Sequence, residues 1–501
     1  MSEVSLQSDK MRNRSIGKLL MEMSLPAIFS MLVQSLYNIV DSLFVTNMTS
    51  NIFGQYNGTN LGGDSFNAVS IVFPLTTFVV AIAIGIGVGA NAYIARKLGE
   101  GNREKANQAA KTSIVMAAVA WVVLVLLALT VAKPFVSFFV TDNCTDPAYV
   151  IQQSTWYIQI YMIGSIGLLV EIVCNRMLQA TGNMRVPMIS QLIGALTNIA
   201  LDWLFISIFS WGVIGAIAAT VVGQWCACTF TLINFFRFKQ DVSISLKGFK
   251  PSSEYFKRIL RAGLPAFVMN AVGAVITIIM NTMLKEYANG IQVLSAYFKV
   301  QSFVFMPVFG LMQGTMPILS YNYGANQKPR FNQTFKLALS IACGVMIFGT
   351  LLFQIFPEAL MSIFKSKALS GNMTQADLDA YNALFIKEGA YAYRVISIAF
   401  IPAVFSILII NMLQSINRPT SSLFMSLSRQ LLFLIPSAIL FNYLWQQDGI
   451  WFAYPFAEVM SLIVYTPTAI KNYRKQFAYK ENQYRTKQLG NHQVEVEQPQ
   501  Q

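Results

Sequence analysis

Long apolar runs, separated by short polar loops, dominate the sequence. Twelve of these runs are long enough to cross the hydrocarbon core of a membrane as α-helices. They lie near residues 24–46, 67–93, 110–132, 155–180, 187–208, 212–236, 260–284, 294–320, 334–357, 388–416, 419–444 and 449–470. The pattern therefore predicts an all-α polytopic membrane protein with twelve transmembrane helices.

The second half of the chain repeats short motifs of the first half. A Leu-Pro-Ala motif, a Gly-x-x-x-Gly pair and a Met-Leu-Gln motif return after 239, 225 and 235 residues, and they begin at Leu25 and Leu264, Gly85 and Gly310, Met177 and Met412. These offsets indicate duplication of a unit of six spans. Because six is even, both halves have the same orientation, and we predict two six-helix lobes related by a pseudo-twofold axis along the membrane normal. We expect close helix packing at the glycine pairs.

The repeat and the apolar runs predict five segments. They are a cytoplasmic N-terminus at 1–23, an N-terminal lobe at 24–236, a cytoplasmic linker at 237–259, a C-terminal lobe at 260–471 and a cytoplasmic tail at 472–501. The tail is polar, charged and rich in Gln, and it holds the only histidine, His492. Because it has no apolar period, we expect it to be disordered.

Basic residues gather on one side of the predicted membrane. The formal net charge is +13, and 28 Lys and Arg side chains, Arg176 and Arg185 among them, fall in the termini and loops of one side, against five on the other. This asymmetry predicts that both termini are cytoplasmic, in a multi-pass protein of a bacterial inner membrane. The basic residues occupy short loops rather than one exposed face, so we expect no nucleic-acid partner.

Composition and motifs exclude several other classes of protein. With 54% hydrophobic and 12% charged residues, the chain is too apolar for a soluble multidomain protein. The five cysteines lack zinc spacing, the glycine pairs are not followed by the Gly-Lys-Ser/Thr of a nucleotide loop, and the loops carry no catalytic constellation. We expect no enzymatic activity, no cofactor apart from a coupling ion, no signal peptide, and a monomer surrounded by membrane lipids.

The strongest candidate site consists of polar residues inside apolar runs. Asn198 and Asp202 are four residues apart on one face of the predicted fifth span, Asp41 lies in the first span and Thr220 in the sixth. An ionisable side chain inside a membrane costs several kcal/mol unless it faces protein, water or an ion. From the span limits, all four lie at similar depth in the outer half of the N-terminal lobe. Two carboxylates, an amide and a hydroxyl suit Na⁺, and neighbouring carboxylates also favour sharing a proton.

The second lobe provides an internal control for this site. By the repeat offsets, Asp41 corresponds to Met280, Asn198 to Phe433 and Asp202 to Ser437. If these polar groups were required for folding, the second lobe would be expected to have polar residues at the equivalent positions. It has no equivalent site, which favours a functional role in the first lobe. The alternative for Asn198 and Thr220 alone is an interhelical hydrogen bond, which is the usual role of such residues in membranes.

Four further polar residues are weaker candidates for a substrate cavity. Glu171 lies four residues before Asn175 in the fourth span, and Glu458 lies near the middle of the twelfth span. Glu458 either contacts a cationic substrate or pairs with Arg429 of the eleventh span, and the sequence leaves both readings open.

At this point the chain resembles the multidrug and toxic compound extrusion (MATE) family. The resemblance covers essentially all spans and rests on ordered motifs: Ser24-Leu25-Pro26 with Asp41, Gly85-x-Gly87-x-Gly89 with Arg96-Lys97-Leu98-Gly99, Asn175 to Asn183, Asn198 to Asp202, Gly215 to Thr220, Tyr323 to Asn326, and Met412 to Gln414. It implies two six-helix bundles, drug/cation antiport by alternating access, and an N-lobe cation site at Asp41, Asn198, Asp202 and Thr220. The NorM branch also has acids in spans 7 and 10. This chain has none around Gly273 in span 7 and none in the body of span 10, so the resemblance favours a DinF-like or MepA-like branch.

These observations predict an antiporter coupled to H⁺ or Na⁺ that exports small organic compounds, mainly cationic amphiphiles. The alternative within the same superfamily is a flippase for lipid-linked oligosaccharide precursors, for which a basic central cavity would be expected. A cation channel would need a continuous polar pore with rings of ligands, and the one-sided site argues against it.

Overall fold

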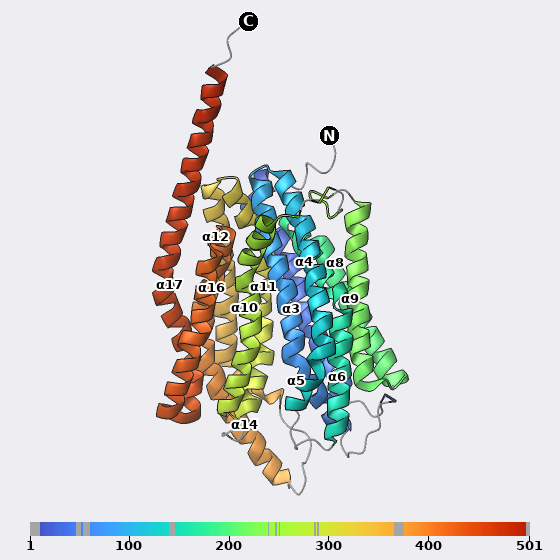
Figure 1. The fold of residues 1–501 in the computed structure, drawn as a ribbon. Helices are drawn as coiled ribbons and strands as arrows, with labels where there is room; N and C mark the ends of the chain where they lie inside the picture. Colours follow the sequence, from blue (N-terminus) through green and yellow to red (C-terminus); the bar gives the residue numbers. More distant parts are fainter. Residues whose placement is uncertain are drawn as a thin grey trace.

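The computed structural model describes residues 11–46, 52–53, 61–139, 146–238, 240–245, 248–249, 251–284, 287, 290–364 and 375–496. Helices make up almost all of this part of the chain, and it contains no strand. The N-terminal lobe consists of α2 (Ile16–Thr46), α3 (Leu61–Gly99), α4 (Arg103–Thr130), α5 (Ala132–Phe139), α6 (Pro147–Gly164), α7 (Ile166–Ala180), α8 (Arg185–Asp202), the π-helix η1 (Trp203–Ile208) and α9 (Gly212–Arg237). Figure 1 shows these helices packed side by side in one bundle with those of the second lobe.

The C-terminal lobe follows the same plan. It consists of α10 (Ser253–Leu284), α11 (Gly290–Gly324), α12 (Lys328–Ile355), α13 (Pro357–Ser362), α14 (Gln375–Ser397), α15 (Phe400–Ser415), α16 (Pro419–Leu427), the π-helix η2 (Ser428–Leu434) and α17 (Ile435–Val496).

The helices account for the predicted number of spans. Within the described residues, nine helices are long and apolar enough to cross a membrane, and the bent pairs α6–α7 and α14–α15 raise the number to eleven. The last of the nine, Pro419–Asn482, joins two helical parts at Gln446, where the backbone leaves the helical region (φ 52°, ψ −137°). Counting these parts separately gives the twelve predicted spans.

Two turns show that the repeat extends to the backbone. Gly101 (φ 74°) and Asn326 (φ 57°) are 225 residues apart, and Gly182 (φ 92°) and Asn417 (φ 63°) are 235 apart. All four follow a helix end and adopt the left-handed conformation, which Gly and Asn tolerate better than other residues. The backbone hydrogen bonds agree as well: the amides after Gly101 and Asn326 both bond to a carbonyl five residues back, at 2.9 and 2.8 Å. This geometry ends both helices in the same way.

Glycines allow the first crossing between the lobes, where α3 packs against α10. A Cβ added to Gly89 would overlap the carbonyl oxygen of Ile259, and one added to Gly263 would overlap the carbonyl oxygen of Gly85. The two backbones are therefore in direct contact, as in other crossings built on small residues. The expectation of close packing at Gly85 and Gly89 is confirmed.

The second crossing, of α11 against α2, is the equivalent of the first crossing under the repeat of the two lobes. A Cβ on Gly310 would lie 2.5 Å from the Cα of Ile28, and one on Gly314 would lie 2.9 Å from the Cα of Ser24. The glycines are offset from those of the first crossing by 225 residues, and Ser24 is offset from Gly263 by 239. The two lobes thus exchange equivalent contacts, as a pseudo-twofold relation requires.

The C-terminal segment differs from the expected disordered tail. Helix α17 continues to Val496, and Phe477 is only 3% exposed. Phe477 packs edge-on against Tyr323 and Phe331, with ring centroids 5.5 and 5.1 Å apart. The sequence pattern did not predict this helix, because isolated buried aromatic residues such as Phe477 in a polar segment do not form a continuous apolar run.

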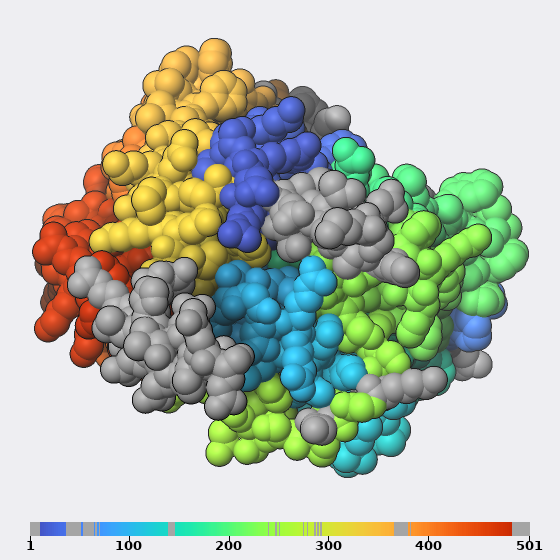
Figure 2. All heavy atoms as spheres, turned by 90° about the horizontal axis from the view of Figure 1, so that it is seen from above, coloured from blue at the N-terminus to red at the C-terminus, as the bar shows by residue number. Residues whose placement is uncertain are grey.

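Contacts between the lobes also join them at one end of the bundle. We call the end at which α2 begins and α17 ends the terminal face (Figure 1). Here Lys480 of α17 donates to Glu100, directly after α3, at 2.6 Å. Figure 2 looks onto this face, where the cyan atoms of the first lobe lie directly against the yellow atoms of the second.

Candidate functional site

A close approach of α8 and α9 brings the predicted polar residues together. A Cβ on Gly223 would lie 2.8 Å from the carbonyl oxygen of Gly194, so only glycine fits between these backbones. One turn away, Asn198 Nδ2 donates to Thr220 Oγ1 at 3.2 Å, and Thr220 Oγ1 donates to the carbonyl oxygen of Ala216 at 3.0 Å. Asn198 Oδ1 is buried and has no hydrogen-bond partner among the described residues. Its amide oxygen is therefore available to a ligand.

Asp202 ends α8, and its side chain is fully buried. The chain then continues as the π-helix η1, a local widening of the helix that often occurs at functional sites. Asp41 lies on α2, but its side chain is outside the described residues. Its helix packs against both α8, which carries Asn198 and Asp202, and η1.

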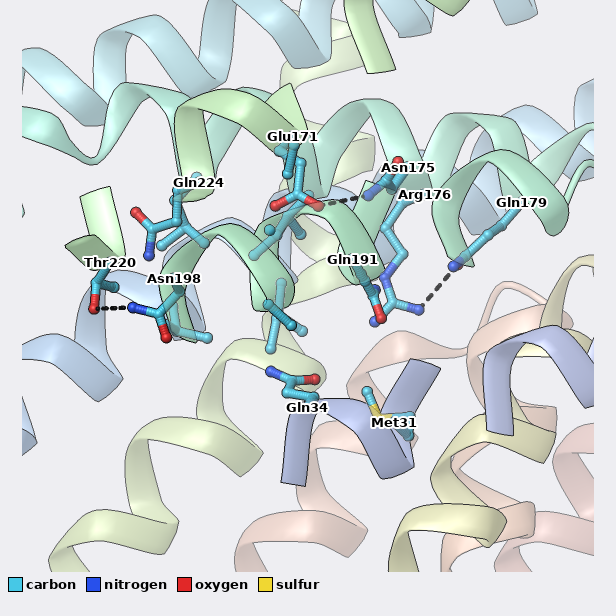
Figure 3. A pocket seen from close by; sticks show the side chains of 17 residues that line it. Met31, Gln34, Glu171, Asn175, Arg176, Gln179, Gln191, Asn198, Thr220 and Gln224 are labelled. Atoms are coloured by element: carbon cyan, nitrogen blue, oxygen red, sulfur yellow. Dashed lines mark hydrogen bonds between the residues drawn. The ribbon is translucent and has the colours of Figure 1, made fainter. Parts of the chain in front are cut away.

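A cavity of about 140 Å³ runs through the N-terminal lobe beside this pair. Asn198 and Thr220 lie at one end of it, and Arg176 and Gln179 lie at the other (Figure 3). The described residues that line it are Met31, Gln34, Val80, Ile84, Leu168, Glu171, Ile172, Asn175, Arg176, Gln179, Gln191, Gly194, Ala195, Asn198, Thr220, Gln224 and Ala227. They come from α2, α3, α7, α8 and α9, so the cavity belongs to one lobe.

A bend in the fourth span turns α7 toward the cavity. Helices α6 and α7 meet at 46°, at Gly164 and Ser165, a Gly/Ser pair of the kind at which helices kink. The indole of Trp121 donates to the carbonyl oxygen of Ile163 at 2.8 Å, and that of Trp225 donates to the carbonyl oxygen of Gly164 at 3.2 Å. These side chains satisfy carbonyl groups that the interrupted helix leaves open.

Glu171 is the acidic residue of the cavity, and it is buried in a hydrogen-bond network. Its Oε1 accepts from Asn175 Nδ2 at 2.9 Å and from Ser190 Oγ at 3.1 Å. Thr231 Oγ1 extends the network to Asn175 Oδ1 at 3.2 Å. Glu171 and Asn175 both line the cavity, and Glu458 and Arg429 do not.

The structure resolves the two readings of Glu458 and Arg429. Arg429 Nη1 donates to Glu458 Oε1 at 2.9 Å, and the side chains are 14% and 15% exposed. The residues lie in the C-terminal lobe, where η2 carries Arg429 and α17 carries Glu458. The two opposite charges are therefore paired within the lobe, although Arg429 Nε and Glu458 Oε2 are buried and have no hydrogen-bond partner among the described residues.

Arg176 lies inside α7, in agreement with the predicted span 155–180, and its side chain lines the cavity. The sequence counts it among the basic residues of one side of the membrane and gives it no role in the site. Charge counting alone cannot show which way such a side chain points.

Three glutamines of the cavity were also missed, and the sequence does hold a signal for them. Gln34 precedes Asp41 by seven residues, Gln191 precedes Asn198 by seven, and Gln224 follows Thr220 by four. These spacings place each glutamine on the same helix face as a predicted site residue. Extending those faces along the helix would have found all three.

Comparison with known protein sequences gives one consistent result. A family model described as MatE matches residues 26–204 and 265–440, one segment in each lobe. Multidrug export protein MepA of Staphylococcus haemolyticus (strain JCSC1435) is 25% identical over 381 residues, which cover 74% of this chain and 80% of that protein. The protein of the same name from Staphylococcus aureus (strain MRSA252) is 24% identical over 342 residues, 68% of this chain and 71% of that one.

Solved structures share the fold. A multidrug resistance MATE family transporter of the MOP superfamily, in an outward-facing conformation, has a TM-score of 0.82 at 21% identity, with 96% of this chain and 99% of that chain covered. A MOP superfamily transporter from Pyrococcus furiosus, described as having a binding pocket of reverse polarity, has a TM-score of 0.80 at 22% identity, with 94% and 98% covered.

Proposed function

The chain belongs to the MatE family of membrane transporters, and we propose that it exports amphiphilic, mainly cationic organic compounds in exchange for H⁺ or Na⁺. The curated relatives are named as multidrug export proteins, which supports this substrate class. The proposal also includes alternating access, a monomer, and cytoplasmic termini in the inner membrane of a bacterium.

One observation carries the coupling part of the proposal. Asn198 of α8 lines the cavity, and its amide oxygen has no hydrogen-bond partner among the described residues. The fully buried Asp202 lies one turn further along the same helix. A carboxylate, an amide oxygen and the hydroxyl of Thr220 are oxygen ligands, which suit Na⁺, and the carboxylates of Asp202 and Asp41 suit a proton.

The cation would act through the packing of α2. This helix carries Asp41, lines the cavity with Met31 and Gln34, and contacts α11 of the other lobe. A cation that neutralises the acids in one conformation better than in the other shifts the population of the two by that difference in affinity. Substrate and cation then exclude each other because each favours a different conformation.

The contacts at the terminal face agree with a state that is sealed on the cytoplasmic side. The two glycine crossings and the Lys480–Glu100 contact would separate when the cytoplasmic side opens.

Efflux of ethidium from cells tests the proposal. We expect cells that produce the wild-type protein to retain less ethidium than control cells, and Asp41→Asn to abolish the difference at equal protein level in the membrane. Normal efflux by the variant would refute the coupling role. Transport of lipid-linked oligosaccharide without efflux of any dye would instead support the flippase; against that alternative, the described cavity lining has a single basic residue.

A further inference from the structure

The described residues that line the cavity include one acid and one base. Among the described residues that line it, only Glu171 and Arg176 are ionisable as acid or base, and both lie on α7. Five residues separate them, which corresponds to about 7.5 Å along the helix axis. The other polar lining groups are amides and one hydroxyl, so the cavity is not simply an acidic site for cations.

Glu171 is held in a fixed orientation with one oxygen left for a ligand. Both hydrogen bonds that it accepts from described residues, those of Asn175 and Ser190, end on Oε1. Figure 3 shows the other carboxylate oxygen on the opposite side, toward Gln224. An ammonium or iminium group in the cavity would find a preorganised acceptor there.

Within the part of the chain that the structure describes, the guanidinium of Arg176 has no carboxylate partner. Its Nη1 donates to Gln179 Oε1 at 3.1 Å, and no carboxylate of the described residues forms an ion pair with it. Its guanidinium lies beside Gln191 in Figure 3. A guanidinium has five N–H donors, so this hydrogen bond leaves donors for a ligand. An ionisable group inside a membrane-spanning segment is costly to bury, which makes Arg176 a candidate functional residue.

We propose that this cavity selects zwitterionic amphiphiles, with the cationic group at Glu171 and a carboxylate at Arg176. The planar fork of a guanidinium matches a carboxylate through two parallel hydrogen bonds, which makes arginine suited to this group. The inference rests on the proposed export function and narrows its substrates: a compound with both charges satisfies both side chains, whereas a simple cation leaves Arg176 unpaired.

A matched pair of dyes tests the role of Arg176. Rhodamine 110 carries a carboxylate, and rhodamine 123 is its methyl ester with the same cationic ring system. Binding of each to the purified full-length protein in detergent is measured by fluorescence anisotropy. We expect the wild type to bind the acid more tightly than the ester, and Arg176→Gln to weaken the acid about tenfold, the effect of losing a hydrogen bond to a charged group, with the ester changed less than twofold.

Three further variants make the result specific. Arg176→Lys should restore part of the affinity for the acid, since it keeps the charge without the fork. Glu171→Gln should weaken both dyes alike, since both carry the cation. Arg185→Gln, an exposed arginine outside the cavity, should change neither. Equal loss of both dyes in Arg176→Gln, no loss of the acid, or no binding of either dye by the wild type would overturn the proposal.

Transport is measured separately, so the two proposals fail in different ways. Arg176-dependent binding without movement of dye under any cation gradient contradicts export and leaves the recognition of zwitterions standing. If a gradient drives transport and Arg176→Gln changes the binding of both dyes equally, the role of Arg176 is contradicted and the export function is still supported.

Discussion

Buried polar side chains determine what each lobe can do. In the N-terminal lobe the buried Glu171 and Asn198 face a cavity, together with the half-buried Arg176. In the C-terminal lobe Glu458 and Arg429 form an ion pair with each other. Spacing within a helix predicted Asn198 and Asp202 together, because neighbours on a face can be read from the chain, and similar depth in the next span added Thr220. It could not decide between partners on different helices, which is why the pairing of Glu458 needed the structure.

The Arg429–Glu458 pair gives a prediction about stability. Arg429→Met or Glu458→Leu alone leaves a buried charge without a partner and should cost about 3–5 kcal/mol of unfolding free energy. The double variant removes both charges and should cost less than either single variant. Thermal unfolding of the three variants in detergent measures this, and additive losses would show that the two side chains act independently.

The crossing helices hold the two lobes together through backbone contacts. The sequence indicated glycine packing but not the partners, because the crossing of α3 with α10 joins residues about 170 apart. The segment after residue 471 was misjudged for a related reason. Its order depends on tertiary contacts of Phe477 and Lys480 rather than on an apolar face of its own.

Two glycines of α10 form a matched pair for testing the crossing. Gly263→Ala should lower the melting temperature, because its Cβ would overlap the carbonyl oxygen of Gly85 and overpacking costs about 1–3 kcal/mol. Gly273 has no neighbour within 4 Å of such a Cβ, so Gly273→Ala should be neutral or stabilising by up to about 1 kcal/mol. Equal melting temperatures for the two variants would argue against a tight crossing.

The contact of α17 with Glu100 predicts a pH dependence. Burial alone raises the pKa of Glu100, but hydrogen bonds from Lys480 and Lys97 outweigh burial and lower the pKa below its ordinary value of 4.5. The contact therefore stabilises the fold above about pH 4.5, and this contribution is lost as the pH falls through the lowered pKa.

Thermal unfolding at pH 7 and at decreasing pH checks this contact. Lys480→Met should lose up to about 1 kcal/mol at pH 7 and show a weaker decline in acid than the wild type. The exposed Lys475 lies on the same helix, and Lys475→Met serves as the control. Identical acid profiles of the Lys480 variant and the wild type would contradict the role of Glu100.

The whole molecule is a duplicated fold with an unduplicated site. Equivalent turns, bends and glycine crossings relate the lobes. The repeat was predictable because the Leu-Pro-Ala, Gly-x-x-x-Gly and Met-Leu-Gln motifs return at similar offsets. The cavity and its polar groups belong to the N-terminal lobe alone. This asymmetry is expected if one lobe exchanges the cation while both lobes move.

Dye transport into inside-out vesicles, with a Na⁺ gradient and a proton gradient imposed separately, tests the cation coupling most directly. Vesicles from cells that produce the wild type, Asp202→Asn or the control Glu254→Gln, an exposed acid at the start of α10, are compared at equal protein level with ethidium as substrate. We predict that one of the two gradients drives uptake by the wild type and the control, and that Asp202→Asn is folded but inactive. Uptake by Asp202→Asn at the wild-type rate, or uptake that neither gradient changes, would contradict the account.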